Sequence, residues 1–388
     1  MRTPVLCVFG TRPEAIKMAP VIRALDASDC LRPVVCVTDQ HEEMLDQVLD
    51  FFDVKPDFRL GVMRRGQSPS EVAARILERL PPVLAEVQPF GVLVQGDTTT
   101  TLAAALAAFY ARVRVGHVEA GLRTYRRDAP FPEEVNRQMT TAVTEWHFAA
   151  TEWARANLLR EGVAPAAVVV TGNPVVDALQ WAVAKLDGDG LHEPTDGLRR
   201  ILVTAHRRES FGEPFLEICR GLHDVADRNP DVELCYPVHL NPNVQEPVSR
   251  ILGGHARIRL LPPVGYREMV ALLQGCHIVL TDSGGIQEEA PSLGKPCLVM
   301  RETTERPEGV EAGTARLVGA SRDRIVEETE RLLHDARAYE QMARAHNPYG
   351  DGRAGARIAD ILAAVHGEES RSAAASASAM CSPAWPSP

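Results

Sequence analysis

The chain reads His277-Ile-Val-Leu-Thr-Asp-Ser-Gly-Gly-Ile-Gln-Glu-Glu289, an apolar run that leads directly into two glycines. A short apolar run before turn residues is typical of a buried strand, and the residues after Gly285 suit a helix. Glycines let the backbone approach a phosphate, and free N–H groups at a helix start attract anions. We therefore expect an anion site at Ser283, Gly284 and Gly285, with Glu289 placed to bind a ribose. An ordinary turn is the alternative interpretation.

Apolar runs alternate with helical patterns over most of the 388 residues, which predicts an α/β fold with two doubly wound, mostly parallel sheets. A Gly- and Asp-rich stretch at 187–197 separates the two series. We expect Rossmann-like domains at 1–172 and 173–351, and a helix at 352–366 for which packing on the first domain is one option. Residues 367–388 are rich in Ala, Ser and Pro, and we expect them to be disordered.

The expected strands and helices follow from this alternation. The strands are 4–9, 33–38, 91–95, 113–118, 146–150, 167–171, 199–204, 232–236, 256–260, 277–281, 296–300 and 315–318. The helices expected in the first half of the chain are 14–26, 41–51, 69–86, 98–111, 132–144, 151–161 and 174–186.

Composition excludes several classes of protein. The formal net charge of −10 argues against nucleic acid or an anionic membrane as the main partner. No stretch is long enough to span a bilayer. The eight cysteines show no Cys-x-x-Cys pair and no metal-ligand spacing, so we expect reduced thiols in a cytoplasmic enzyme without a metal. Neither a Gly-x-Gly-x-x-Gly motif nor a P-loop follows the first strand, which argues against dinucleotide or ATP binding.

Three carboxylates follow strand ends in the first half of the chain: Asp97, Glu119 and Glu133. Asp97 has a second interpretation as a helix N-cap, and Glu133 as a complement to a helix dipole. Because successive strand ends of one parallel sheet lie side by side, we expect the three to converge on one wall of a cleft. Clustered carboxylates raise one another's pKa, and acid/base chemistry near neutral pH needs such tuning.

Basic side chains follow other strand ends, mostly in the second half of the chain. Arg12 can alternatively pair with a surface carboxylate, and His206 and His239 can be core histidines. Acids in one domain and cations in the other suit an anionic diphosphate held by one domain and a neutral sugar processed by the other. The basic residues are Arg12, Lys17, His206, Arg207, His239 and Arg306.

Eight motifs follow one another over about residues 4–365, in the same order as in a known family. They are Gly-Thr-Arg-Pro-Glu at 10–14, Gly-Asp-Thr at 96–98, His-Val-Glu-Ala-Gly at 117–121, Pro-Glu-Glu-Val-Asn-Arg at 132–137, Thr-Gly-Asn-Pro at 171–174, His-Arg-Arg-Glu-Ser at 206–210, Asp-Ser-Gly-Gly-Ile-Gln-Glu-Glu at 282–289 and Arg-Glu-Thr-Thr-Glu-Arg-Pro-Glu at 301–308. Together they resemble the non-hydrolysing UDP-N-acetylglucosamine 2-epimerases.

The resemblance implies a fold of the glycosyltransferase-B type, with two domains facing across a cleft, and a homodimer. It implies reversible conversion of UDP-GlcNAc to UDP-ManNAc without an added cofactor, by elimination of UDP to a 2-acetamidoglucal and re-addition. By motif position, Asp97, Glu119 and Glu133 match the catalytic carboxylates, and we place His206 beside them. The matches to the family's UDP contacts are Arg12, Lys17, His206, Ser283, Gly284, Gly285 and Glu289.

The chain departs from the family at an allosteric UDP-GlcNAc site. Gln40 and His41 keep the family pattern, but Glu43 replaces an amide and Gly66 replaces an arginine. We therefore expect weak or absent activation by UDP-GlcNAc. Three other functions stay open: a hydrolysing 2-epimerase that releases ManNAc and UDP, a UDP-sugar glycosyltransferase of the same fold, and a nucleotide-sugar sensor without catalysis.

Overall fold

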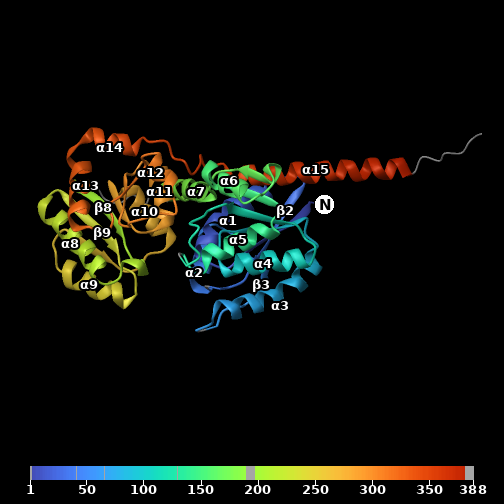
Figure 1. Ribbon diagram of the computed structural model, residues 1–388, viewed down its shortest axis with the longest axis horizontal. Coiled ribbons are helices and arrows are strands. Elements are labelled where there is room, and N and C mark those ends of the chain that lie inside the picture. The colour runs from blue at the N-terminus through green and yellow to red at the C-terminus, as the bar shows by residue number, and fades with distance from the viewer. Residues whose placement is uncertain (1, 41, 65, 129, 189–196, 381–388) are drawn as a thin grey trace, which may run out of the picture. The chain divides into compact units, whose positions relative to one another are not determined.

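The computed structural model describes residues 2–40, 42–64, 66–128, 130–188 and 197–380 (Figure 1). Its internal contacts divide the chain into two compact units. Unit 1 comprises Met1–Pro174 and Arg353–Pro388, and unit 2 comprises Val175–Gly352. These limits fall close to the domain limits expected at 172 and 351.

Unit 1 contains a seven-stranded, wholly parallel sheet in the order β3-β2-β1-β4-β5-β6-β7. Its inner strands β1, β4, β5 and β6 are almost wholly buried, as expected for a parallel sheet covered on both faces. The chain order reverses between β1 and β4, and ligands of such sheets bind beyond the carboxyl ends of the strands at this reversal. The strands are β1 (Thr3–Phe9), β2 (Leu31–Val37), β3 (Phe58–Arg59), β4 (Gly91–Gln95), β5 (Val115–Ala120), β6 (Trp146–Ala149) and β7 (Val168–Val170).

Helices connect the strands of unit 1 and pack on the sheet. Helix α4 carries five alanines between Ala103 and Ala108, and all five are buried against the sheet core and α3. The helices are α1 (Arg12–Asp26), α2 (Glu42–Phe51), α3 (Pro69–Val87), α4 (Thr99–Tyr110), α5 (Glu133–Val143) and α6 (Glu152–Arg160), with a short η1 (Pro165–Ala167).

Unit 2 repeats the plan with six parallel strands in the order β10-β9-β8-β11-β12-β13. The order reverses between β8 and β11. The strands are β8 (Arg199–Thr204), β9 (Val232–Pro237), β10 (Ile258–Leu261), β11 (Ile278–Thr281), β12 (Cys297–Val299) and β13 (Ala315–Leu317). The helices are α7 (Pro174–Gly188), η2 (Arg208–Ser210), α8 (Glu213–Arg228), α9 (Pro242–Leu252), α10 (Tyr266–Gly275), α11 (Gly284–Ser292), α12 (Pro307–Glu311), α13 (Arg322–His334) and α14 (Ala336–Ala343).

Two features differ from the sequence expectations. Strand β3 was not expected, because two residues are too few for an apolar pattern to be recognised. The expected disorder does not hold for residues 367–380, where the last helix, α15 (Ala354–Met380), continues. Alanine has the highest helix propensity, and this segment is rich in it. Residues 381–388 lie outside the described residues. No helix in the described part of the chain is long and apolar enough to cross a membrane.

Helix α15 returns to unit 1, where it packs along α1 (Figure 1). Arg357 Nη1 donates a hydrogen bond to the carbonyl of Thr171 over 3.0 Å. Gly355 lies so close to α1 that a Cβ atom added to it would be 2.7 Å from the carbonyl oxygen of Pro20. The close approach of α15 to α1 therefore requires glycine at position 355.

Two glycine-to-alanine changes on α15 test this packing. Gly355→Ala places a methyl group against a backbone carbonyl, so we expect it to destabilise unit 1 by about 1–3 kcal/mol. Gly367→Ala is the matched control, because its nearest neighbour is a flexible arginine tip at 3.7 Å. The control should be neutral or stabilising by about 1 kcal/mol, since alanine favours helix over glycine. Equal urea midpoints for the two variants would disprove the close approach.

Candidate active site

The motifs of unit 1 gather where the chain order of its sheet reverses. Glu14 lies in the first turn of α1 and is 1% exposed. Its Oε2 accepts hydrogen bonds from the backbone N–H groups of Gly10 at 3.0 Å and Thr11 at 2.7 Å, and its Oε1 accepts one from the Thr98 hydroxyl at 2.6 Å. Burial raises the pKa of this carboxyl. Glu14 therefore ties the turn after β1 to the turn after β4.

Glu119 stands at an irregularity in the sheet. The register between β5 and β6 shifts between Val118 and Ala120. The backbone φ of Glu119 is +63°, a left-handed conformation that costs a residue with a side chain about 1–3 kcal/mol. Bulges of this kind re-aim side chains and are over-represented beside active sites. The local strain thus fixes the direction of a carboxylate that is 8% exposed.

The Glu119 carboxylate is surrounded by donors from three other segments of unit 1. Lys17 Nζ lies 2.7 Å from both of its oxygens. Asn173 Nδ2 donates to Oε1 at 2.9 Å, and Gln95 Nε2 donates to Oε2. A buried carboxylate must be paired and hydrogen-bonded, and here both conditions are met. Lys17, matched above to a UDP contact, is thus engaged with a carboxylate of its own unit.

Asp97 is held by residues of α5. Arg137 Nη2 lies 3.0 Å from Asp97 Oδ2, and Asn136 Nδ2 donates to the Asp97 carbonyl at 2.9 Å. The Arg137 side chain is 3% exposed, whereas that of Asp97 is 28% exposed. A buried cation thus fixes one oxygen of a carboxylate that remains in reach of a ligand. Thr98, not Asp97, caps α4, so the capping interpretation of Asp97 is wrong.

Two adjacent glutamates at the start of α5 differ in their surroundings. The Glu134 side chain is fully buried, and its carboxylate accepts hydrogen bonds from the N–H groups of Thr124 and Tyr125 at 2.9 and 3.0 Å. It also lies 3.6 Å from Arg137, which supports the contact of that arginine with Asp97. Glu133 is only half-buried. Helix α5, which bears Glu133, contacts Asp97 through Arg137 and packs against β5, which bears Glu119.

His117 supports the turn before Asp97. Its Nε2–H donates to the carbonyl of Gly96 at 2.7 Å, and Gly96 has the positive φ of +72° that this turn requires. Burial lowers the pKa of His117 to about 3, from an ordinary value of 6.5. The imidazole is therefore neutral near pH 7 and serves as a fixed donor.

The reversal point of unit 2 is organised by Asp282, which follows β11 and is fully buried. Asp282 Oδ2 accepts hydrogen bonds from the backbone N–H groups of His206 at 2.6 Å and Arg207 at 2.7 Å, which follow β8. The His206 side chain is 42% exposed, and its ring stacks on that of His239 with centroids 5.3 Å apart. The two histidines therefore form one exposed surface, and the core interpretation does not hold for either.

Helix α11 begins at the two glycines, as the sequence predicts. Ser283 is its N-cap residue, and the hydroxyl does not cap the helix. A Cβ atom on Gly284 would meet the Arg306 guanidinium at 2.4 Å, whereas one on Gly285 would have nothing within 4 Å. Glu289 is buried beside Tyr266, and burial together with this carboxylate raises the pKa of the phenol.

The arginines of unit 2 are less available than the sequence suggested. Glu305 accepts hydrogen bonds from Arg301 and Arg306 at 2.8 Å each, and it lies 3.5 Å from Arg207. Burial raises the pKa of Glu305, but the three arginines outweigh this effect and lower it strongly. Arg306 is 7% exposed and also pairs with Glu288. Its charge is thus offset within the protein, and it supports Gly284 rather than extending into solvent.

The remaining predicted residues lie in unit 1. Arg12 is half-buried at the first position of α1. Gln40 Oε1 accepts a hydrogen bond from the Thr100 hydroxyl at 2.9 Å, beside the turn after β4. His41 and the side chain of Glu43 lie outside the part of the chain that the structure describes.

Three buried acids with organising roles were missed in the sequence. They are Glu14, Glu134 and Asp282. Glu14 stands three residues after Thr11, the spacing of a capping box, and Glu134 stands three residues before Arg137. These spacings were available signals, whereas the contact of Asp282 with the β8 turn depends on tertiary structure alone.

Comparisons with known proteins agree with the motifs. Residues 23–363 match the family model described as UDP-N-acetylglucosamine 2-epimerase. A UDP-N-acetylglucosamine 2-epimerase of Escherichia coli strain K12 is 55% identical over 367 residues, which cover 92% of this chain and 98% of the relative. A probable enzyme of the same name from Ralstonia solanacearum is 57% identical over 93% of this chain and 98% of its own.

Solved structures show the same likeness. The UDP-GlcNAc 2-epimerase of Neisseria meningitidis, bound to UDP-GlcNAc, is 47% identical with a TM-score of 0.88, over 92% of this chain and 99% of that one. The enzyme of Methanocaldococcus jannaschii, in complex with UDP-GlcNAc and UDP, is 32% identical with a TM-score of 0.76, over 93% and 99%. The expected fold class, two doubly wound parallel-sheet domains of the glycosyltransferase-B type, is confirmed.

The neutral state of His117 makes the stability of the fold depend on pH. Below pH 6.5 the unfolded chain binds a proton at this residue, whereas the folded chain does so only near pH 3, so stability is lost as the pH falls between these values. Between pH 6.5 and 4.5 this one group should lower the free energy of unfolding by about 2 kcal/mol.

Urea unfolding at the two pH values measures this loss. His117→Gln keeps a donor for Gly96 but does not titrate, so its loss of stability over this range should be smaller than that of the wild type by the same amount. Parallel pH dependences for the two proteins would show that burial does not keep His117 neutral.

Proposed function

The chain belongs to the UDP-N-acetylglucosamine 2-epimerase family, and on that premise we propose that it interconverts UDP-GlcNAc and UDP-ManNAc at carbon 2. The observation that carries the proposal is the pair of carboxylates Asp97 and Glu119. Each is held by buried partners at the reversal point of one sheet, where ligands of such folds bind.

The reaction needs acids and bases because the proton on carbon 2 has no adjacent carbonyl and is weakly acidic. If the bond from carbon 1 to the UDP oxygen breaks first, carbon 1 gains positive charge and the neighbouring proton becomes labile. Loss of that proton gives UDP and 2-acetamidoglucal. Return of UDP to carbon 1, with a proton added to the other face of carbon 2, gives the epimer.

The residues of unit 1 suit this proton work. Asp97 has one oxygen held by Arg137 and remains 28% exposed, so it can meet a sugar. Both oxygens of Glu119 contact Lys17, and this contact stabilises the ionised carboxylate. Lys17 can in turn transfer a proton or stabilise the negative charge that develops during the reaction. We propose that Asp97 and either Glu119 or Glu133 act on opposite faces of carbon 2.

The residues of unit 2 suit the leaving group. The start of α11 offers backbone N–H groups and the Ser283 hydroxyl to a diphosphate, and His206 and His239 present exposed rings. Donors placed where negative charge develops stabilise the departing UDP. Glu289 is the proposed ribose contact. Arg207 is a further candidate, whereas Arg306 acts through its support of Gly284.

Incubation of the purified protein with UDP-GlcNAc in deuterium oxide, followed by proton NMR, tests the proposed function. We expect the carbon-2 proton signal to disappear while a lasting mixture of UDP-GlcNAc and UDP-ManNAc forms. Accumulation of free ManNAc with UDP would instead show hydrolysis. Binding of UDP-GlcNAc without exchange would show a sensor, and sugar transfer to an added acceptor would show a glycosyltransferase.

Substitution of the carboxylates separates chemistry from nucleotide binding. Asp97→Asn and Glu119→Gln each remove an acid/base group, so we expect deuterium exchange at carbon 2 to slow by about 100-fold or more. Calorimetric titration should show UDP affinity within a few-fold of the wild type, because the proposed UDP contacts of unit 2 remain. Exchange at the full rate in either variant would remove that residue from the proposal.

The two glycines of α11 offer a matched pair. Gly285→Ala has open space for its methyl group, so stability should be kept while UDP binding weakens by about 10-fold or more, since the backbone can no longer approach a phosphate. Gly284→Ala should lower stability, because its methyl group meets Arg306. Unchanged UDP affinity in Gly285→Ala would place the diphosphate elsewhere.

We also propose that the protein is a cytoplasmic homodimer. The seven cysteines in the described part of the chain are all free, and six of them are buried, which suits a reducing compartment. Sedimentation of the purified protein at two concentrations would measure the oligomeric state.

A further inference from the structure

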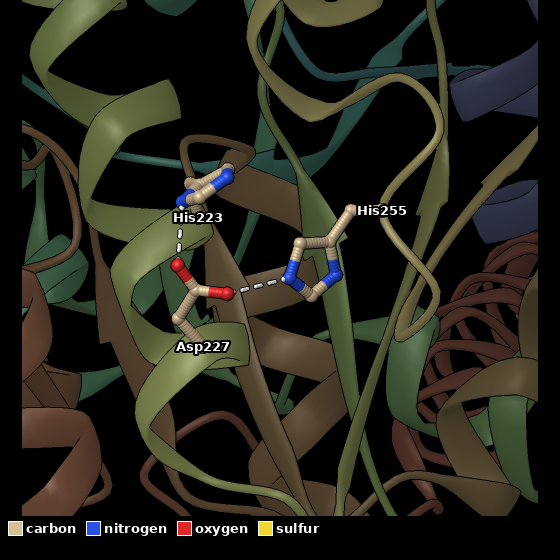
Figure 2. Close-up of side chains that lie close together, drawn as sticks. All are labelled: His223, Asp227 and His255. Atoms are coloured by element: carbon tan, nitrogen blue, oxygen red, sulfur yellow. Dashed lines mark hydrogen bonds and ion pairs between the residues drawn. The ribbon is translucent and has the colours of Figure 1, made fainter.

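Two histidines and an aspartate meet on the surface of unit 2. His223 and Asp227 stand one turn apart near the end of α8, and His255 comes from the loop between α9 and β10. Figure 2 shows the two imidazole rings on either side of the Asp227 carboxylate. His223 Nδ1 lies 3.3 Å from one carboxylate oxygen, and His255 Nε2 lies 2.9 Å from the other.

These separations are close to those of metal ligands. Bonds of about 2.0–2.1 Å from zinc to nitrogen or oxygen, in tetrahedral geometry, place ligand atoms about 3.3 Å apart. One atom from each of the three residues lies within 4.8 Å of the others. Small rotations of the side chains therefore suffice to bring all three onto one ion. Among the described residues, no other group of His, Cys, Asp or Glu meets this criterion.

We propose that His223, Asp227 and His255 form a binding site for Zn²⁺ or a closely similar divalent transition-metal ion. Two imidazole nitrogens and one carboxylate oxygen form a donor set that such ions favour, and water can complete the coordination. The side chains are 36%, 55% and 13% exposed, so an ion can reach them from solution.

The position of the cluster gives the ion a structural role. Helix α8 follows β8 and runs back along a parallel sheet, so its end lies at the edge where β9 and β10 begin. The nucleotide motifs of unit 2 follow the opposite ends of β8 and β11. An ion here joins the end of α8 to the loop before β10, and the partial negative charge at the end of a helix favours a cation.

Metal binding requires one rearrangement at His255. Its Nδ1 accepts a hydrogen bond from the N–H of Arg257 at 3.2 Å, so in the metal-free protein the ring proton is on Nε2, facing Asp227. The metal takes the place of that proton, which moves to Nδ1, and the long bond from Arg257 is lost. The Arg257 guanidinium, which donates to the carbonyl of Ala226 at 2.8 Å, lies near the cluster and moderates the affinity for a cation.

Titration of the full-length, metal-stripped protein with Co²⁺, monitored by visible absorption, tests the site. The variants are His223→Gln, Asp227→Asn and His255→Gln, and the control is His346→Gln, which removes an exposed histidine of the same unit. We expect the wild type and the control to bind one Co²⁺ with an absorption that Zn²⁺ abolishes. Each ligand variant should lose affinity by more than the roughly 10- to 100-fold that loss of an outer partner of a metal site causes.

A second measurement guards against misfolding. All variants should keep the wild-type melting temperature and UDP affinity without metal, and Zn²⁺ should raise the melting temperature of the wild type and the control only. Equal Co²⁺ affinity in the wild type and the three ligand variants would overturn the proposal. So would the absence of metal binding by the wild type, which would leave the cluster as a hydrogen-bonded group only.

Discussion

The ion pair between Lys17 and Glu119 is the contact on which the arrangement of unit 1 depends. Glu119 is buried in a left-handed conformation, and both features are unfavourable for an isolated glutamate. Lys17, Asn173 and Gln95 offset them, and each comes from a different segment of unit 1. Because the charge of Glu119 has to be matched, helix α1, the turn before α7 and the end of β4 are all held against β5. The strain is thus stored at the carboxylate that the proposed chemistry uses.

A buried carboxylate holds the turns together at the reversal point of each sheet. In unit 1 the buried carboxylate of Glu14 accepts backbone N–H groups from the turn after β1, and in unit 2 that of Asp282 does so from the turn after β8. Each acid connects two strand ends that are distant in sequence. Backbone hydrogen bonds of the sheet reach only the first residues beyond the strands, such as that from the Gly96 N–H to the Val118 carbonyl at 3.0 Å, so buried acids add the order that a ligand site requires.

Much of this could be predicted from the sequence, for reasons that differ between residues. The strand, glycines and helix at 277–289 follow from local sequence patterns, and the structure contains β11 and α11 there. The placement of Asp97 and Glu119 at strand ends was predictable, but their partners Arg137 and Lys17 depend on long-range packing. Pattern also failed to distinguish Glu133 from Glu134, since only burial separates them. The sequence suggested Arg306 as a ligand contact because it does not show that Glu288 and Glu305 pair with this arginine.

The proposed epimerisation requires that the bond between carbon 1 and the UDP oxygen breaks while UDP stays bound. UDP-GlcNAc with oxygen-18 in the position that bridges carbon 1 and the β-phosphorus tests it directly by phosphorus NMR. If elimination occurs, the freed β-phosphate can turn before the sugar returns, and the label will appear in non-bridging positions of recovered UDP-GlcNAc. Conversion to UDP-ManNAc with the label wholly retained in the bridge of both sugars would contradict the account.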